Sequence, residues 1–139
     1  MTWAVRFMHA GAERLCRFEY RRAALPVSAR RGAQIVLLQW GRRPNEPGTL
    51  PLGGWARLTH IQGAVWDHYA PKPVRIPAQW FAERDVTGRE QWFMVTRGTF
   101  LQGCVVRHRN ERRVYVVTLD CAPDVGEFER WPRIIAASS

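Results

Sequence analysis

The chain is short of acidic residues and has almost no lysine. Twelve aspartates and glutamates stand against 21 lysines and arginines, Lys72 is the only lysine, and the formal net charge is +9. A surplus of this size favours polyanionic partners, and the flat guanidinium group of arginine suits both phosphate and stacking on rings. A GC-rich genome would also replace lysine by arginine, but that exchange leaves the net charge unchanged. Nucleic acid is therefore the leading class of partner.

Cysteines and long apolar runs are also scarce. The three cysteines, Cys16, Cys104 and Cys121, show no C-x-x-C spacing, and no histidine pair stands at zinc-finger distance. This pattern argues against a disulfide framework and a structural metal, so we expect no metal, no cofactor and a reducing, cytoplasmic environment. The first 15 residues lack the apolar core of a signal peptide, and no later stretch approaches a membrane span. A membrane partner is not expected.

A chain of 139 residues is most simply one domain, long enough to bury a proper core. Strand-like patterns cover residues 34–40, 91–96, 100–107 and 113–119, and the last two flank a polar tip that indicates a hairpin. Prolines and glycines mark residues 45–54 as a loop. The pattern is therefore mostly that of strands with turns between them.

Two short helices are expected beside these strands. Residues 58–69 carry apolar residues at helical spacing, although Gly63 weakens the pattern, and residues 123–131 have acidic residues early and Arg130 late. We therefore predict an α+β fold, with a β-rich single domain, a mixed or barrel-like sheet and a few short helices.

Glu83 is the most informative single residue. It follows Trp80 and Phe81, which favour a dry setting. Burial there favours the protonated carboxyl group, so Glu83 could exchange a proton near neutral pH and serve as a general acid and base. The plainer interpretation is an ion pair with Arg84 or a neighbouring arginine, which is the commoner role of such a residue.

Three short motifs follow one another along the chain. They are QWGRRP at residues 39–44, IPAQWFAE at residues 76–83 and ERWP at residues 129–132. In this order they resemble the SOS-response-associated peptidase (SRAP) family, whose members carry a Trp-Gly-x-x-Pro strand end, a Pro-Ala-x-x-Phe-x-Glu segment and a His-x-Arg-Met-Pro-like motif near the end. The resemblance extends from about Cys16 to Ile135.

The resemblance implies a role in the response to DNA damage. Family members recognise abasic sites in single-stranded DNA and trap them covalently through a cysteine at their own N-terminus. The ring-opened sugar is an aldehyde, which an α-amine converts to an imine and the neighbouring thiol closes to a thiazolidine. By this analogy Cys16 is the nucleophile, Glu83 is the acid and base, and the partner is single-stranded DNA with abasic sites.

Cys16 lies inside the chain, and its nitrogen is an ordinary amide. The family chemistry therefore requires that residues 1–15 be absent from the active protein. They are either an extension upstream of a true start at Leu15, in register with the Met-Cys-Gly-Arg beginning of family members, or a leader removed by self-cleavage. In both versions residues 16–139 form the SRAP-like domain, an enzyme with cysteine-dependent crosslinking or autopeptidase activity. The plain alternative for Cys16 is a small buried apolar residue.

Two family positions are occupied by other residues. Trp55 in Trp55-Ala56-Arg57 replaces the family's asparagine, and Phe128 replaces the histidine of the terminal motif. The second hypothesis is therefore a phage-related relative that only binds single-stranded nucleic acid, its chemistry lost with those two side chains. A cysteine hydrolase that acts on other peptides is a weaker third hypothesis, because no histidine partner stands beside the nucleophile.

Basic and aromatic residues around these motifs are the expected contacts with the DNA strand. Guanidinium groups would bind phosphates, and indole rings would lie under exposed bases. The set comprises Arg57, Arg42, Arg43, Arg75, Trp40 and Trp55. The plain alternative is a solvated face with core indoles, above all for Trp40, whereas Arg57 is the best single candidate because it keeps a family position.

Overall fold

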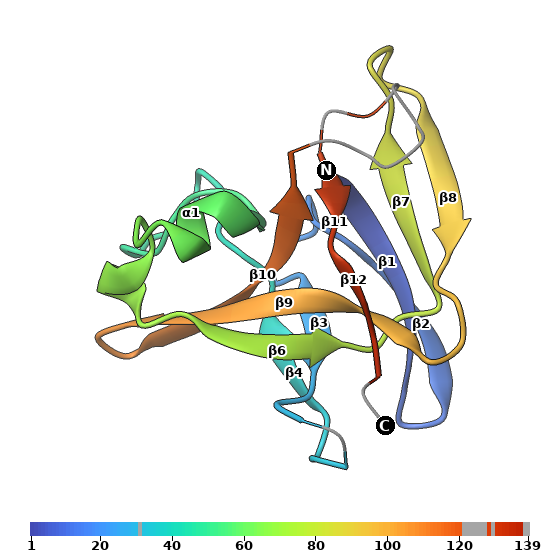
Figure 1. Ribbon diagram of the computed structural model, residues 1–139, viewed down its shortest axis with the longest axis horizontal. Helices are drawn as coiled ribbons and strands as arrows, with labels where there is room; N and C mark the ends of the chain where they lie inside the picture. Colours follow the sequence, from blue (N-terminus) through green and yellow to red (C-terminus); the bar gives the residue numbers. More distant parts are fainter. Residues whose placement is uncertain (31, 121–127, 129, 138–139) are drawn as a thin grey trace.

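The computed structural model describes residues 1–30, 32–120, 128 and 130–137 (Figure 1). Four antiparallel strands form the first sheet, in the order β2-β1-β7-β8. Their bounds are Thr2–His9 for β1, Ala12–Arg17 for β2, Trp80–Arg84 for β7 and Glu90–Met94 for β8. The first residues of the chain thus lie inside this sheet, because β1 pairs with both β2 and β7.

A larger sheet is built around the antiparallel hairpin of β9 (Thr99–His108) and β10 (Glu111–Leu119). Strands β6 and β12 pair with β9, whereas β5 and β11 pair with β10, and β5 runs parallel to β10. These four strands span Trp55–Arg57 (β5), Lys72–Ile76 (β6), Trp131–Pro132 (β11) and Ile134–Ala136 (β12). A separate ribbon pairs β3 (Ala24–Val27) with β4 (Val36–Gln39).

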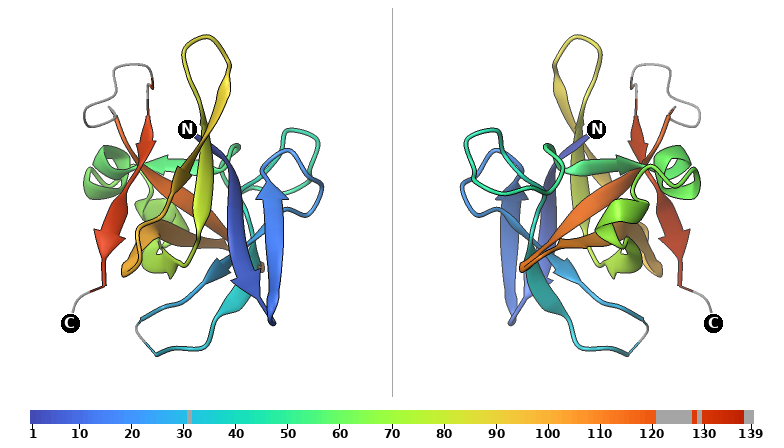
Figure 2. Two further views of the ribbon diagram at one scale, coloured as in Figure 1. Left: turned by 90° about the vertical axis from the view of Figure 1, so that its right-hand side faces the viewer. Right: turned by 90° about the vertical axis from the view of Figure 1, so that its left-hand side faces the viewer.

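The main hydrophobic core is shared by all three sheets. It contains Val5 and Phe81 from the four-stranded sheet, Leu25 from the ribbon, and Leu101 and Val116 from the larger sheet. In Figure 2 the strands β1 and β2 lie on the opposite side of the molecule from β11 and β12. Period-two alternation along each strand supplies this core, since successive side chains point to opposite faces.

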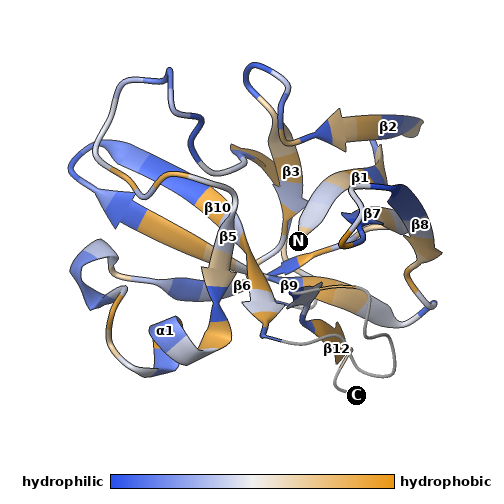
Figure 3. Ribbon diagram, turned by 90° about the horizontal axis from the view of Figure 1, so that it is seen from above, coloured by the Kyte–Doolittle hydropathy of each residue, from blue (hydrophilic) through white to orange (hydrophobic). Residues whose placement is uncertain are grey.

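A second core cluster lies on the other face of the β9–β10 hairpin. It joins Cys104 and Tyr115 to Leu50 and Trp66, and two short helical segments pack against it, α1 (Leu58–Gln62) and the 3-10 turn η1 (Asp67–Tyr69). Figure 3 shows that the tip of this hairpin is hydrophilic while its middle is hydrophobic. The hairpin is thus the central element of the fold, with apolar side chains packed on both of its faces.

Most of the predicted elements are confirmed, but the helices are shorter than expected. The hairpin and the strands near residues 34–40 and 91–96 are present, and the loop at residues 45–54 contains no strand. The expected helix at residues 58–69 is interrupted at Gly63, which is the C-cap of α1. Residues 123–127 and 129 of the second expected helix lie outside the described residues, and Trp131 belongs to β11.

The β-rich class with a few short helices is confirmed, and pairing is mixed because β5 is parallel. The sheets are open, and no closed barrel is seen in the part of the chain that the structure describes. Among those residues no helix has both the length and the apolar character needed to cross a membrane.

Candidate active site

Glu83 lies at the inner face of β7 and is completely buried, with 0% of its surface exposed. The predicted burial is therefore confirmed. The expected pairing with Arg84 is not found, because the Arg84 guanidinium donates a 2.7 Å hydrogen bond to Glu19. The partner that lies opposite Glu83 in the sheet is Thr2, at the head of β1.

An irregularity in β1 turns Thr2 toward Glu83. Thr2 pairs with Glu83, but Ala4 pairs with Ala82, so β1 carries one more residue than β7 across this step. Directly opposed residues share a face of a sheet, and a bulge changes which face a side chain occupies. Thr2 therefore shares the inner face with Glu83, whereas Ala4 lies on the outer face. Such bulges are common next to active sites.

The head of β1 brings an amine to this carboxyl group. The α-nitrogen of Met1 lies 2.9 Å from Oε1 of Glu83 and donates a 3.0 Å hydrogen bond to the carbonyl of Arg130. Apart from this ion pair, no described residue makes a well-aligned hydrogen bond to either Glu83 oxygen or to Oγ1 of Thr2, and all three atoms are buried. Buried carboxyl and hydroxyl oxygens with so few well-aligned hydrogen bonds are unusual in a folded protein.

Burial is the main influence on the proton affinity of Glu83. It raises the pKa of the carboxyl group above its ordinary range, and the positive charges of the Met1 amine and Arg130 oppose this only in part. Desolvation disfavours the charged form of an acid, so a larger fraction of Glu83 is protonated near neutral pH than of an exposed glutamate. The site therefore holds an amine and a proton donor in contact.

Two aromatic and basic segments hold the head of β1 in place. The indole of Trp55 donates a 2.7 Å hydrogen bond to the carbonyl of Thr2, and its ring packs at 4.8 Å against Trp3. Arg130 donates hydrogen bonds of 3.0 and 2.6 Å to the hydroxyl of Thr118. Its guanidinium nitrogen also lies 3.4 Å from the sulfur of Met1.

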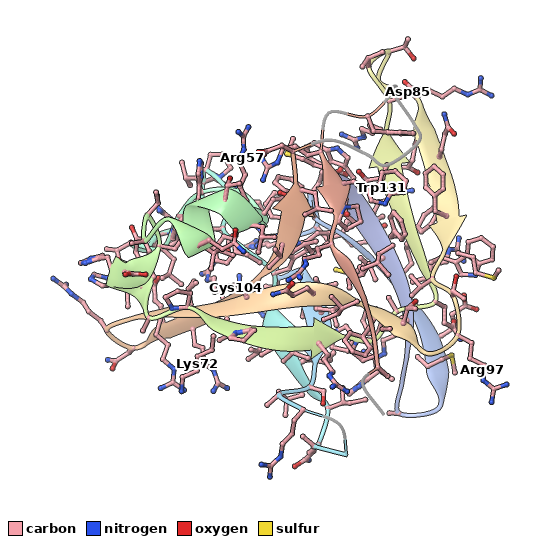
Figure 4. The ribbon with its side chains drawn as sticks, viewed as in Figure 1. Arg57, Lys72, Asp85, Arg97, Cys104 and Trp131 are labelled. Carbon is pink, nitrogen blue, oxygen red and sulfur yellow. The ribbon has the colours of Figure 1, made fainter. Side chains whose placement is uncertain are left out.

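The site is open to solvent beside Met1. A pocket of about 220 Å³ is lined by Met1, Trp3, Arg84, Asp85 and Val86. The guanidinium of Arg84 lies 4.2 Å above the ring of Trp3. Arg57 is exposed and forms a 3.8 Å ion pair with Asp120. Burial is the main cause that lowers the pKa of Arg130, and the positive charge of Arg57 lowers it further. Figure 4 shows Arg57, Trp131 and Asp85 at the same end of the molecule as the chain's N-terminus in Figure 1.

Cys16 does not lie beside Glu83. It stands opposite Val5, which in turn stands opposite Phe81, so β1 separates it from the strand that carries the carboxylate. Its side chain belongs to the main core, and burial raises the pKa of its thiol. Residues 1–15 form β1 and most of β2, so their removal would delete the strand that joins β2 to β7. The plain alternative, a small buried apolar residue, describes what Cys16 does in this structure.

Four of the six predicted DNA contacts have structural roles instead. Trp40 is fully buried, and its indole donates to the carbonyl of Gly54. Arg43 is buried beside Glu46, and Arg42 donates to the carbonyls of Glu46 and Leu50. Arg75 covers the ring of Phe100 at 4.6 Å on β6 of the larger sheet. Trp40 and Arg43 are buried, so these two predictions are wrong as exposed strand contacts. Arg42 and Arg75 are half-buried, and their contact with DNA stays a prediction.

The other two predicted residues, Arg57 and Trp55, belong to the segment beside the head of β1. Trp55 is half-buried and donates its hydrogen bond to Thr2, and Arg57 is exposed. Phe128, at the family's histidine position, is buried against Phe93 and Trp131 at ring distances of 5.7 and 5.4 Å. It offers packing and no proton.

Sequence reasoning missed Met1, Thr2 and Arg130 as site residues. The family resemblance points to a cysteine as the reacting residue, whereas no residue type in the sequence marks a reactive α-amine. The only available signal was the strand-like sequence that begins directly after Met1. In the described residues no group of three or more histidine, cysteine, aspartate or glutamate side chains could hold a metal ion. No family model, no curated protein and no solved structure matches this chain.

Proposed function

We propose that the protein, in a form whose chain begins at Met1, is an SRAP-like DNA-damage protein that captures abasic sites in single-stranded DNA through the amine at the head of β1. This replaces Cys16 as the reacting group. One observation carries the proposal: the α-nitrogen of Met1 lies 2.9 Å from the carboxylate of Glu83, which is fully buried and lies beside the hydroxyl of Thr2. Imine formation needs an amine and a proton shuttle in contact, and these two groups meet that requirement.

The reaction begins when Glu83 takes a proton from the Met1 ammonium group, which frees the nitrogen lone pair. The nitrogen adds to the aldehyde carbon of the ring-opened sugar and gives a carbinolamine. Glu83 returns a proton to the departing hydroxyl, and one molecule of water leaves as the imine forms. The dry setting supports the first step, because burial favours the neutral amine and acid over the ion pair relative to water.

Thr2 makes the site tolerant of methionine removal. Loss of Met1 would place the amine on Thr2, whose backbone lies opposite Glu83 and whose buried hydroxyl lies beside the Glu83 carboxyl group. That hydroxyl could then add to the imine carbon, with its proton passing to nitrogen, to close a five-membered oxazolidine. This product is the oxygen counterpart of the thiazolidine that the resemblance implies. Either form of the chain carries an amine at the carboxylate.

Two further observations support DNA as the source of the aldehyde. Two of the three segments quoted for the SRAP resemblance, 76–83 and 129–132, contribute Glu83 and Arg130 to one site. Trp55, which replaces the family's asparagine, supports the same site through its hydrogen bond to Thr2. Arg84 lines the pocket, Arg130 contacts Met1 beside it, and the charge of Arg57 acts on Arg130, in a chain of net charge +9. Phosphates of a single strand would bind these guanidinium groups and bring the sugar to the amine.

Borohydride trapping tests this proposal directly. Protein is incubated with a labelled single-stranded oligonucleotide that carries one abasic site, and cyanoborohydride reduces any imine to a stable amine. We expect a protein–DNA band that survives denaturation, and peptide mapping should place the adduct on residue 1 or 2. Glu83→Gln should reduce the rate by about a hundredfold or more, as for loss of a general acid and base. Glu13→Gln, an exposed glutamate on β2, is the matched control.

Blocking the amine gives an independent measurement. Acetylation of the N-terminal amine, confirmed by intact mass, should abolish the adduct and leave reversible DNA binding in place. Reversible, salt-sensitive binding without any adduct in the untreated protein would favour the second hypothesis, a binding module without chemistry. An adduct that maps to Cys16 would contradict the amine and restore the cysteine.

A further inference from the structure

A second concave site, independent of the proposed function, lies where the β3–β4 ribbon crosses the larger sheet. It is a groove of about 220 Å³ that shares no residue with the pocket at Met1. Val74 of β6 and Val105 of β9 form one wall, and Val27, Val36 and Leu38 of the ribbon form the other. Val27 and Val105 are also members of the main core. The groove is thus the open end of the core between two layers.

The walls of this groove are aliphatic. Val36 is 41% exposed and no aromatic ring is among the lining residues, which also include Ala29 and Ala70. Bound nucleobases usually stack on aromatic rings, and here no ring is available for stacking. The groove suits a flexible hydrocarbon chain better than a base.

Three cations gather at the rim. Arg107 lies directly opposite Arg112 in the β9–β10 ladder, and Lys72 lies opposite Val105, two residues from Arg107. All three side chains therefore occupy the face of the sheet that carries Val105. Figure 4 shows Lys72 on the side of β6 that faces β3 and β4. Like charges directly opposite each other destabilise a ladder, so this arrangement carries an electrostatic cost in the empty protein.

Nothing within the described residues neutralises these charges. None of the three side chains makes an ion pair or a side-chain hydrogen bond there, and no acidic residue lines the groove. By contrast, Arg17, Arg43 and Arg113 all have carboxylate partners. A rim of unpaired cations above an apolar cavity is complementary to a molecule with an anionic head and an apolar body.

We propose that this groove binds a medium-chain aliphatic carboxylate, with the chain between the ribbon and the sheet and the carboxylate on Lys72, Arg107 and Arg112. The volume sets the length. At about 220 Å³ the groove is smaller than the roughly 300–1,000 Å³ of most ligand pockets, so a short chain such as that of octanoate suits it. Arginine's fork matches the two carboxylate oxygens, and lysine adds a point charge.

Isothermal titration of the full chain with octanoate tests the proposal. We expect saturable one-to-one binding that weakens with added salt, and at least about tenfold weaker binding of acetate, which lacks the chain, and of octanol, which lacks the charge. Equal affinity for octanoate and octanol would overturn the role of the cations. Displacement of octanoate by an undamaged oligonucleotide would show that the groove is a nucleic-acid site instead.

Paired substitutions separate specific binding from loss of folding. Arg107→Gln with Arg112→Gln should weaken octanoate by about tenfold or more, whereas the exposed Arg97→Gln should have no effect. Val36→Asp places a negative charge in the groove and should abolish binding, while Val65→Asp, at another exposed valine, should not. Thermal melting of each variant reports folding, and the abasic-site adduct should be unchanged in all four. Unchanged octanoate affinity in the double arginine variant would refute the site.

Discussion

Half-buried Glu46 and fully buried Glu83 have opposite surroundings. Glu46 accepts hydrogen bonds from the backbone and side chain of Arg43. It also accepts a 2.7 Å hydrogen bond from Gln39 and a 3.2 Å hydrogen bond from Arg113. Glu83 has one ion pair with the Met1 amine and no other well-aligned partner among the described residues. The two residues share the same chemistry, so the difference lies in how the fold completes their hydrogen bonds.

This difference is visible in their protonation. Burial raises the pKa of Glu46, but hydrogen bonds from Arg43 and the charges of Arg43 and Arg113 outweigh burial, and the net pKa is lowered. Burial dominates at Glu83, and the net pKa is raised. A fully bonded carboxylate stabilises structure, whereas one with spare lone pairs keeps a proton available for exchange. The comparison therefore supports a structural role for Glu46 and the proposed proton transfer by Glu83.

The largest expected effect is the loss of Arg43. Its guanidinium also donates to the carbonyls of Phe18, Trp40 and Gly41, so Arg43→Ala would remove one buried donor from these carbonyls and from Glu46, which keeps Gln39 and Arg113. Removing one partner of a buried ion pair typically costs about 3–5 kcal/mol. Urea unfolding should show a loss of this size, and Arg97→Ala should show none. A loss below about 1 kcal/mol would mean that the Glu46 network does not hold the fold.

The pH dependence of stability should differ in sign between the two glutamates. Since the pKa of Glu83 is raised on folding, its contribution to the free energy of unfolding is lost as pH rises through its folded-state pKa, above about pH 4.3. The pKa of Glu46 is lowered, so its contribution is lost as pH falls below that value. Each slope is at most about 1.4 kcal/mol per pH unit.

Unfolding curves at several pH values would measure both slopes. Glu83→Gln should remove the decline toward high pH, and Glu46→Gln should remove the decline toward low pH. The wild-type chain then shows both. If Glu83→Gln leaves the free energy of unfolding with an unchanged pH dependence above about pH 4.3, the pKa of Glu83 is not raised by folding. The contrast between Glu83 and Glu46 would then be wrong.

A smaller effect is expected at Trp55, which links the two regions. Trp55→Phe keeps most of the ring packing but removes the hydrogen bond to the carbonyl of Thr2. Loss of one such bond costs about 0.5–1.5 kcal/mol, and the less constrained head of β1 should lower the rate of adduct formation. Trp66→Phe, in the second core cluster, should alter stability without changing that rate. Equal rates in both variants would show that the Trp55 bond does not position the amine.

The sequence was sufficient where local pattern decides structure. Strand periodicity predicted the β9–β10 hairpin, and the neighbouring Trp80 and Phe81 predicted the burial of Glu83. The sequence was insufficient where the structure depends on the pairing of strands that lie far apart in the chain. The meeting of Met1 with Glu83 depends on β1 pairing with β7 and on a one-residue bulge, neither of which has a local signature. The identity of the reacting group follows from that register, since a cysteine has the stronger residue signal but occupies a core position.

The smallest effect is expected at Cys16, and it decides between the two candidate nucleophiles. Cys16→Ala removes one sulfur from the main core, which should cost about 0.5–1.5 kcal/mol, comparable with other single-group deletions in a core. The yield of borohydride-trapped adduct should stay unchanged, because the reacting nitrogen lies at the head of β1 and the thiol lies across that strand from β7. A folded Cys16→Ala variant that no longer forms the adduct would reverse this assignment. It would mean that, in the wild-type protein, the packing of Cys16 against Val5 opens and exposes the thiol to the aldehyde.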